Sequence, residues 1–454
     1  MSGPLRLLPG EGDSLPAIPR SHPRTRARPG WATDPIDELA ERLVEQVSGA
    51  VHPYEVAALL ESDGMTGDRI REHYGRAGLF ALAEDLYHRV PRHYPEPPPS
   101  PDPWKPDHWR CALRGLVFAL PGLGYVLGAD LWRGTPDVTG LIAAALVAWA
   151  WNQALSHRAY LRLAAEGPAG AGRALRAGAP AGAVAATVVG LLVSGPGTAS
   201  AFAAGQSCYV AAATVLLVLG RERTLALTLL PVAAGAVCLL WWRTPVVVSS
   251  GLLLVTVALA ALAAGHAIRG TLRAAPSGDA KLPALRDSLP YGLFGLAAGA
   301  LTMLGGSGGS GGTAGARGIV VLTLSMGFAE WLLYRYRGMA VAALRASATV
   351  AGFTLRAGRA MALCLAAYAV LLLAGALAVG ADAVALPALG ALLWTGLLLQ
   401  AFTLAWPPAL GCLAAAAASA AGRPYGIDLL VCPAAAAVLF IWAWRHLGRP
   451  SAHR

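Results

Sequence analysis

The chain has 454 residues, of which 56% are hydrophobic and only 14% are charged, and its formal net charge is +10. Soluble globular proteins carry roughly 25% charged residues, so this composition excludes a chain that faces water throughout. The charge is unevenly divided, because residues 1–110 hold 17 of the 26 acidic and 13 of the 36 basic side chains. Basic residues in a hydrophobic chain usually mark cytoplasmic loops beside lipid headgroups, so we expect the lipid bilayer as a partner and no nucleic acid.

The first 33 residues contain prolines and arginines but no apolar core of the length that a secretory signal needs. We predict a disordered tail over residues 1–33. Without a cleaved signal, we expect the N-terminus to lie in the cytoplasm.

Residues 34–90 are the only stretch typical of a soluble fold. We predict four short amphipathic helices that begin near Asp34-Pro35, His52-Pro53, Thr66 and Leu79, and the first three starts carry capping or first-turn residues. The residues that we expect to point inward on the first helix are Ile36, Leu39, Leu43 and Val47, and on the last Phe80, Ala83, Leu86 and Tyr87. The sequence thus predicts a small helical cytoplasmic module, with an acidic face that could recruit a protein partner.

Residues 91–110 form a proline-rich linker, with eight prolines between positions 91 and 107. Such a run favours an extended polyproline II spacer. The alternative is a ligand for a proline-binding domain.

Hydrophobic segments recur at regular intervals after Cys111, and most reach the ~20 residues that a membrane span requires. The fold class is therefore all-α, a polytopic transmembrane helix bundle of about 12 spans. We place the spans near residues 111–131, 137–157, 179–197, 199–219, 224–242, 245–267, 289–305, 318–334, 361–380, 383–405, 408–421 and 427–443.

The distribution of basic residues gives an independent test of this topology. With a cytoplasmic N-terminus and twelve spans, nineteen basic residues after position 110 fall inside and four fall outside. This agrees with the positive-inside rule and predicts a cytoplasmic C-terminal tail over residues 444–454. We expect the protein in the cell (plasma) membrane.

The longest inner loop, residues 268–288, divides the bundle into halves of similar length, residues 111–267 and 289–443. Six spans in each half give both halves the same orientation. This 6+6 arrangement suits a parallel pseudo-repeat about an axis along the membrane normal, as many transporters have.

Glu330 is the sharpest functional candidate, because a carboxylate within a span is costly and usually faces a cavity or a cation. It could bind a coupling proton or a cationic group of a substrate. The alternative is a structural ion pair with Arg335 or Arg337, about one turn away.

Polar residues in other spans could line a pathway with Glu330, namely Gln206, Asn152 and Gln400. The alternative is hydrogen bonding between helices, which is the commoner use of such groups.

A basic segment after the eighth span interleaves arginines with apolar residues over positions 335–360. It could form an amphipathic helix on the inner leaflet. The arginines would either bind a phosphorylated headgroup or only anchor the topology; they are Arg335, Arg337, Arg345, Arg356 and Arg359.

Cofactor and enzyme signatures are missing from the sequence. The six cysteines form no C-x-x-C pair, so we expect no disulfide framework and no cysteine-based metal site. We find no H-E-x-x-H, G-x-S-x-G or Walker motif, and we predict no cofactor, no metal and no catalytic residue.

The N-terminal region resembles that of uncharacterised multi-spanning membrane proteins of actinobacteria. The residues that carry the resemblance are HPYEVAALLESDG at 52–64, REHYG at 71–75 and FALAEDLYHRVPR at 80–92. The 6+6 outline also resembles polysaccharide and lipid-linked-oligosaccharide flippases, in architecture only. Neither resemblance implies a site residue.

Two functional hypotheses follow. The first is a secondary transporter or flippase for an envelope precursor or another amphiphile, with the substrate itself unknown. The second is a non-catalytic membrane scaffold in cell-envelope assembly or division, which recruits a partner through residues 34–90. A membrane enzyme is a distant third hypothesis.

Overall fold

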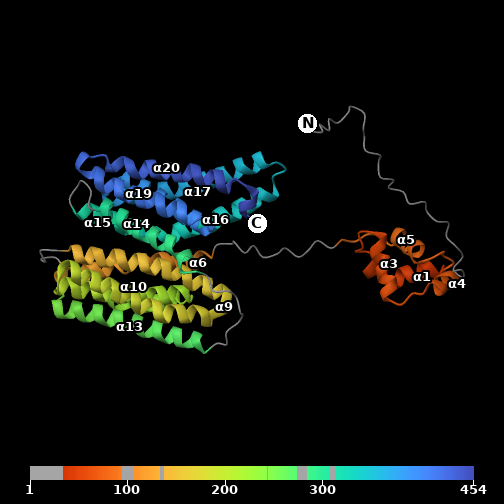
Figure 1. Ribbon diagram of the computed structural model, residues 1–454, viewed down its shortest axis with the longest axis horizontal. Coiled ribbons are helices and arrows are strands. Elements are labelled where there is room, and N and C mark those ends of the chain that lie inside the picture. The colour runs from red at the N-terminus through yellow and green to blue at the C-terminus, as the bar shows by residue number, and fades with distance from the viewer. Residues whose placement is uncertain are drawn as a thin grey trace. The chain divides into compact units, whose positions relative to one another are not determined.

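The computed structural model describes residues 34–94, 107–132, 138–242, 244–273, 284–306 and 312–453. These residues fold into helices without any strand, which confirms the all-α class. The chain divides into two compact units, Met1–Pro101 and Asp102–Arg454 (Figure 1). The predicted tail, residues 1–33, and most of the predicted linker lie outside the described residues.

The N-terminal unit consists of five short helices with well-formed starts. The Asp34 side chain accepts a hydrogen bond from the Ile36 amide, and Thr66 accepts one from Arg69. Both satisfy amides that have no partner within the first turn of a helix. The helices are α1 (Pro35–Arg42), α2 (Val44–Val47), α3 (Pro53–Ser62), α4 (Gly67–Tyr74) and α5 (Leu79–Arg89).

The core of this unit agrees with the predicted inward face of the first helix, since Ile36 and Leu39 are buried. The prediction for the last helix is partly wrong. Leu82 is fully buried on α5, whereas Phe80 is 63% exposed. Two residues apart, they lie on opposite sides of the helix, and Ala83 and Leu86 extend the Leu82 face.

The second unit contains the hydrophobic helices. The first group is α6 (His108–Ala119), α7 (Gly122–Leu127), α8 (Ala129–Trp132), α9 (Thr139–Ser194), α10 (Thr198–Val218), α11 (Glu222–Thr228), α12 (Leu230–Cys238) and α13 (Val246–Leu272). The second group is α14 (Leu289–Gly306), α15 (Gly312–Leu324), α16 (Met326–Arg345), α17 (Val350–Val379), α18 (Ala385–Ala401), α19 (Trp406–Gly422) and α20 (Asp428–Leu447), with 3₁₀ turns at Leu285–Ser288 (η1), Arg423–Tyr425 (η2) and Pro450–His453 (η3).

Eight helical segments among the described residues are long and apolar enough to cross a bilayer. This composition is that of a membrane protein, although eight is fewer than the twelve predicted spans. The eight are His108–Leu127, Thr139–Ser194, Thr198–Val218, Val246–Leu272, Leu285–Gly305, Arg317–Arg345, Val350–Val379 and Leu429–Leu447.

Helix α9 explains part of the difference. It has 56 residues, which at 1.5 Å per residue would extend about 84 Å, far beyond the ~30 Å hydrocarbon core. Gly167 interrupts it with a φ of 70°, in the left-handed region that favours glycine, and Pro168 follows. The element is therefore two helices joined across a kink, and it contains the second and third predicted spans.

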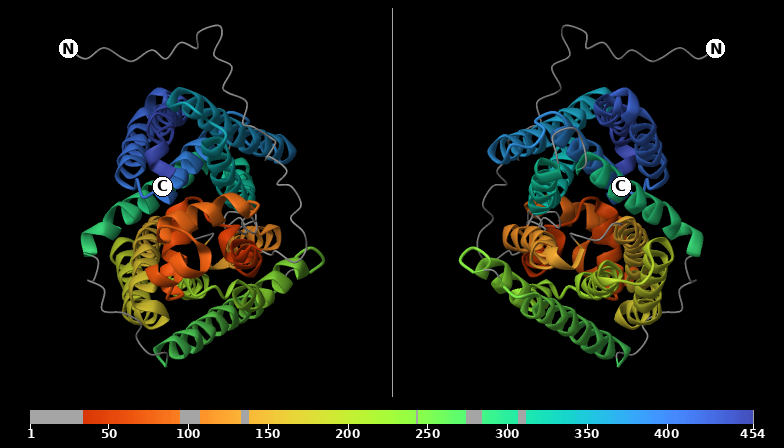
Figure 2. Two further views of the ribbon diagram at one scale, coloured as in Figure 1. Left: turned by 90° about the vertical axis from the view of Figure 1, so that its right-hand side faces the viewer. Right: turned by 90° about the vertical axis from the view of Figure 1, so that its left-hand side faces the viewer.

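The second unit has a separate hydrophobic core in each group of helices. One core joins buried residues between Val117 and Ala267, and the other joins residues between Phe294 and Leu447. We call these groups half 1 (α6–α13) and half 2 (α14–α20). The two halves form two adjacent layers of helices when the unit is viewed along the helices (Figure 2).

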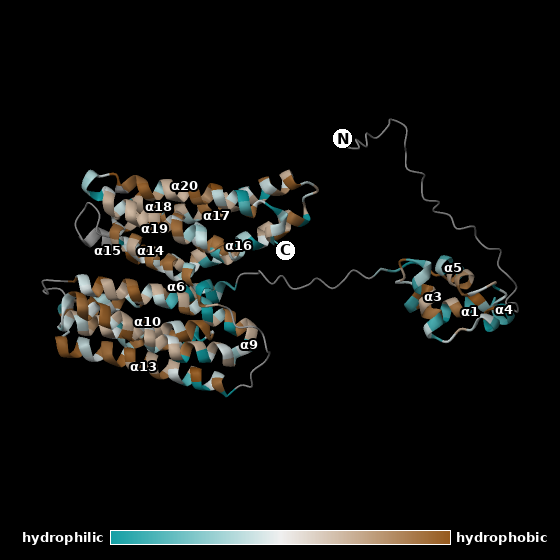
Figure 3. Cartoon of the chain, viewed as in Figure 1, coloured by the Kyte–Doolittle hydropathy of each residue, from teal (hydrophilic) through white to brown (hydrophobic). Residues whose placement is uncertain are grey.

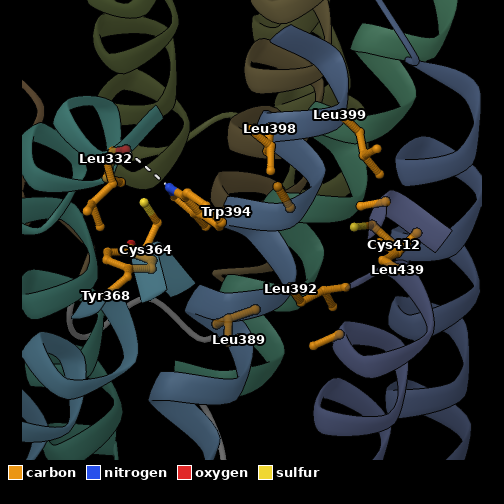
Figure 4. Close-up of a cluster of buried hydrophobic side chains, with 14 of the residues drawn as sticks. Leu332, Cys364, Tyr368, Leu389, Leu392, Trp394, Leu398, Leu399, Cys412 and Leu439 are labelled. Atoms are coloured by element: carbon orange, nitrogen blue, oxygen red, sulfur yellow. Dashed lines mark hydrogen bonds between the residues drawn. The ribbon is translucent and has the colours of Figure 1, made fainter. Parts of the chain in front are cut away.

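Contacts of α6 and of α9 connect the halves. Helix α6 of half 1 packs against α15 and α16 of half 2, and α9 of half 1 packs against α14. Hydrophilic residues gather around the start of α6 (Figure 3). Inside half 2, the fully buried Trp394 indole donates a hydrogen bond to the Ala329 carbonyl at 3.2 Å and ties α18 to α16 (Figure 4).

Candidate functional site

Glu330 of α16 is paired with an arginine from the other half of the bundle. Its Oε1 accepts a short hydrogen bond from Nη1 of Arg114 on α6. The alternative expectation, an ion pair with Arg335 or Arg337, is wrong because Arg114 takes that position. The exposed fractions of the Arg114 and Glu330 side chains are 18% and 19%. The pair thus lies in a largely dehydrated contact between the halves.

Arg114 also binds a glutamate of its own half. Glu222, at the start of α11, accepts hydrogen bonds on Oε1 from Arg114 Nε at 3.2 Å and Nη2 at 3.0 Å. The same oxygen accepts from Arg110 Nε at 3.0 Å and Nη2 at 2.9 Å. We call these four side chains the Arg–Glu cluster: Arg110, Arg114, Glu222 and Glu330.

The Arg–Glu cluster is electrically balanced, with two guanidinium groups and two carboxylates. The guanidinium groups of Arg110 and Arg114 donate hydrogen bonds to Glu222, and these bonds favour the ionised form of its carboxyl group. A charge this buried is tolerable only when it is paired and hydrogen-bonded, as it is here.

A close crossing of α6 and α16 brings the cluster together. A Cβ on Gly327 would lie 2.4 Å from the Cys111 carbonyl oxygen and 3.0 Å from the Gly115 Cα. Beside this crossing, Trp331 donates its indole N–H to Nδ1 of His108 at 3.0 Å. The helices approach closely because neither Gly115 nor Gly327 has a side chain.

The second connection between the halves also depends on glycine. Helix α14 presents Gly292 and Gly295 to α9, where a Cβ would lie 3.1 Å from the Ala150 carbonyl and 2.8 Å from Gln153 Cγ. At the end of this contact, His157 Nδ1 lies 3.1 Å from the Ser288 hydroxyl. Its ring also stacks on Tyr291 with centroids 3.6 Å apart.

The other pathway candidates do not join Glu330. Asn152 is buried in α9 and donates to the Ala148 carbonyl of its own helix, while its Oδ1 has no partner. Gln206 Oε1 on α10 and Gln400 Nε2 on α18 are likewise buried without a partner. Among the described residues, no hydrogen bond links any of these amides to Glu330.

The arginines that follow Glu330 do not lie on a separate surface helix. Helix α16 continues to Arg345 and α17 begins at Val350. The predicted amphipathic segment, residues 335–360, therefore forms the end of one long helix and the start of the next. Arg337 lies over the Phe402 ring, 5.3 Å from its centre. Arg356 donates to the Ala346 carbonyl and to Ser347 across the turn. The other three arginines, Arg335, Arg345 and Arg359, are exposed.

Sequence reasoning missed three of the four cluster members. Arg110, Arg114 and Glu222 are not among the candidate residues that the sequence indicates. A signal was available, because Glu222 is one of only nine acidic residues after position 110 and stands between Arg221 and Arg223.

The site offers no metal-binding set among the described residues, where no three His, Cys, Asp or Glu side chains converge. Comparison with protein-family models, with curated proteins and with solved structures finds no match.

Proposed function

We propose that the protein is a secondary transporter or flippase of the plasma membrane, in which two six-helix halves rock about a central substrate path. The observation that carries the proposal is the position of Arg114. It holds Glu222 in its own half and Glu330 in the other, so it can release one carboxylate and remain paired with the second. We call the Arg114–Glu330 ion pair the latch, because it would hold the two moving halves together when formed and release them when broken.

Twelve spans are compatible with the observed helices. The kinked α9 supplies two, and α11 with α12 forms a broken fifth span. Helices α18 and α19 have 17 residues each, at the short end of the range of about 17–25 residues for a span. Together with the other seven long segments, these give the predicted 6+6 arrangement.

The contacts between the halves support a pseudo-repeat. The first helix of half 1, α6, packs against α15–α16, the second helix of half 2. The second helix of half 1, the first arm of α9, packs against α14, the first of half 2. A two-fold axis along the membrane normal would exchange these two pairs, which is the symmetry of a parallel repeat.

The latch would close the cytoplasmic end of the bundle. The positive-inside rule assigns Arg114 and the start of α6 to that side. The opposite ends of the connecting helices contact their own halves: the Gly140 amide donates to Ser194 at 2.7 Å, and the Leu304 carbonyl accepts from Arg423 at 3.2 Å.

A distance measurement tests the latch. Spin labels at Ala112 on α6 and Ala342 on α16, both exposed, would be placed in the full chain with its native cysteines replaced. We expect one short distance in the wild type and an added longer population in Glu330→Gln. The control is Asp382→Asn, which removes a carboxylate at the start of α18. An unchanged distance distribution in Glu330→Gln would contradict the latch.

A second candidate function, the scaffold, is favoured by an aromatic patch on the N-terminal unit. Tyr54 is 67% exposed and packs edge-to-face on the exposed Phe80, with ring centroids 5.6 Å apart. Residues 34–90 carry twelve acidic and five basic side chains, which suits a basic partner with an apolar anchor. Complementation of the phenotype of a strain that lacks this protein separates the two functions. If deletion of residues 1–101 abolishes complementation while Glu330→Gln leaves it unchanged, the transport proposal fails.

A further inference from the structure

A cavity of about 360 Å³ lies beside the Arg–Glu cluster, between the start of α6 and the turn that leads into α11. Its volume falls within the roughly 300–1,000 Å³ of small-molecule sites. The residues that line it are Asp107, Trp109, Arg110, Leu113, Gly220, Arg221, Glu222, Arg223 and Thr224.

Three arginines supply the charge of this cavity. Arg221 and Arg223 are exposed and form no ion pair with any described residue. Arg110 is half exposed and uses Nε and Nη2 to hold Glu222, and no described residue accepts from its Nη1. Both acids in the lining already accept hydrogen bonds within the protein. Glu222 is neutralised by two arginines, and Asp107 accepts from the Arg110 amide as the cap of α6.

The apolar part of the lining indicates the ligand. Trp109 is 66% exposed at the first turn of the segment His108–Leu127, which is long and apolar enough to span a bilayer. Tryptophan concentrates at the level of the headgroups, where it contacts acyl chains and polar groups together. Leu113 lies one turn further into the span and continues this apolar wall.

We infer that this cavity binds the phosphate group of an anionic lipid, with Arg221 and Arg223 as the main ligands and Arg110 as a third. Guanidinium groups bind phosphate oxygens in a forked geometry, and the site faces the anionic surface expected of the cytoplasmic leaflet. The inference does not depend on transport, since a scaffold would need the same anchor.

The test is lipid binding to the purified full-length chain in detergent, counted by native mass spectrometry. Phosphatidylglycerol is titrated against phosphatidylcholine, for the wild type and for Arg221→Gln with Arg223→Gln. We expect the double substitution to weaken phosphatidylglycerol binding about tenfold, as loss of charge-assisted contacts of this kind does. The control is Arg269→Gln with Arg273→Gln, which removes two other exposed arginines.

Inorganic phosphate and glycerol phosphate are then offered as competitors. If both fail to displace phosphatidylglycerol, the ligand is the headgroup of an intact lipid. If they bind with the same dependence on Arg221 and Arg223 while phosphatidylglycerol does not, the site takes a soluble phosphate and the lipid assignment is overturned. An equal loss of phosphatidylglycerol in the test and control pairs would show diffuse charge attraction and would also overturn the site.

Discussion

Gly115 of α6 lies directly against Gly327 of α16, so that a Cβ on Gly115 would be 3.2 Å from the Gly327 Cα. Arg114 is the neighbour of the first glycine, and Glu330 is one helical turn beyond the second. The ion pair between the halves thus depends on the absence of two side chains. Close packing of the two backbones brings Arg114 and Glu330 within reach of each other.

Replacing Gly327 with alanine should separate α6 from α16. The new Cβ would meet the Cys111 carbonyl oxygen at 2.4 Å, and a backbone atom cannot rotate away. We expect a loss of about 1–3 kcal/mol, as for other overpacked sites, seen as a lower melting temperature in detergent. The same variant should lengthen the distance between labels at Ala112 and Ala342.

The matched control is Gly265→Ala on α13. Nothing lies within 4 Å of a Cβ at that position, so a methyl group should be tolerated. Equal melting temperatures for Gly327→Ala and the wild type would mean that the two helices do not cross in contact.

The two carboxylates of the cluster should differ in their importance for stability. Glu222 is 8% exposed and accepts from both arginines, so Glu222→Gln leaves two guanidinium groups facing each other. We expect roughly 3–5 kcal/mol of destabilisation, typical of a broken buried pair. Glu330→Gln removes one charge-assisted hydrogen bond and should cost about 1.5–3 kcal/mol. Thermal unfolding of the two variants compares them directly.

A double-mutant cycle isolates the pair between the halves. Arg114→Gln and Glu330→Gln should be coupled by about 0.5–3 kcal/mol, because the two side chains are in contact. Additive effects would mean that Arg114 acts only through Glu222.

Helical periodicity predicts the all-α class and the buried face of α1, but eight segments, not twelve, are long and apolar enough to span a bilayer among the described residues. The capped starts at Asp34 and Thr66 and the inward face of Ile36 and Leu39 came from local rules that the structure obeys. Phe80 is an exception, because a large aromatic side chain on an amphipathic helix is expected inside and this one is exposed. On a short helix, the wider face of Leu82, Ala83 and Leu86 determines which side is buried.

The site was harder to predict because its members come from separated parts of the chain. Arg114 and Glu330 are 216 residues apart, and a single sequence gives no distance between them. Spacing suggested Arg335 and Arg337 as partners of Glu330, since they are local. The actual partner depends on which helices pack together, and that depends on glycines whose contacts no periodicity reveals.

The C-terminal turn should be sensitive to acid through His453. Its Nε2 lies 2.8 Å from the Leu447 carbonyl oxygen, and its ring packs edge-on against Phe353 and Phe402. Burial lowers the pKa of His453; the hydrogen bond to Leu447 opposes this shift, and the nearby Arg337 adds to it. The neutral imidazole is therefore the form that the fold favours.

The direction of the pH effect follows from this lowered pKa. The stability that neutral His453 provides is fully present above the ordinary imidazole pKa of about 6.5. It is lost as the pH falls through the lower value of the folded protein. We expect the melting temperature to fall between about pH 7 and pH 5, and His453→Gln to flatten that part of the profile. A profile unchanged by the substitution would assign the acid sensitivity to other groups.

The opposite orientations of Leu82 and Phe80 give a test of the N-terminal unit. Leu82→Ala removes a fully buried side chain and should cost about 2–5 kcal/mol, whereas Phe80→Ala removes an exposed ring and should change stability by less than about 0.5 kcal/mol. Hydrogen exchange of the α1–α5 amides in the full chain measures both. Faster exchange in Phe80→Ala than in Leu82→Ala would restore the inward assignment of Phe80. With the expected result, Phe80→Ala becomes a clean probe of the aromatic patch, because any loss of partner binding could not be attributed to unfolding.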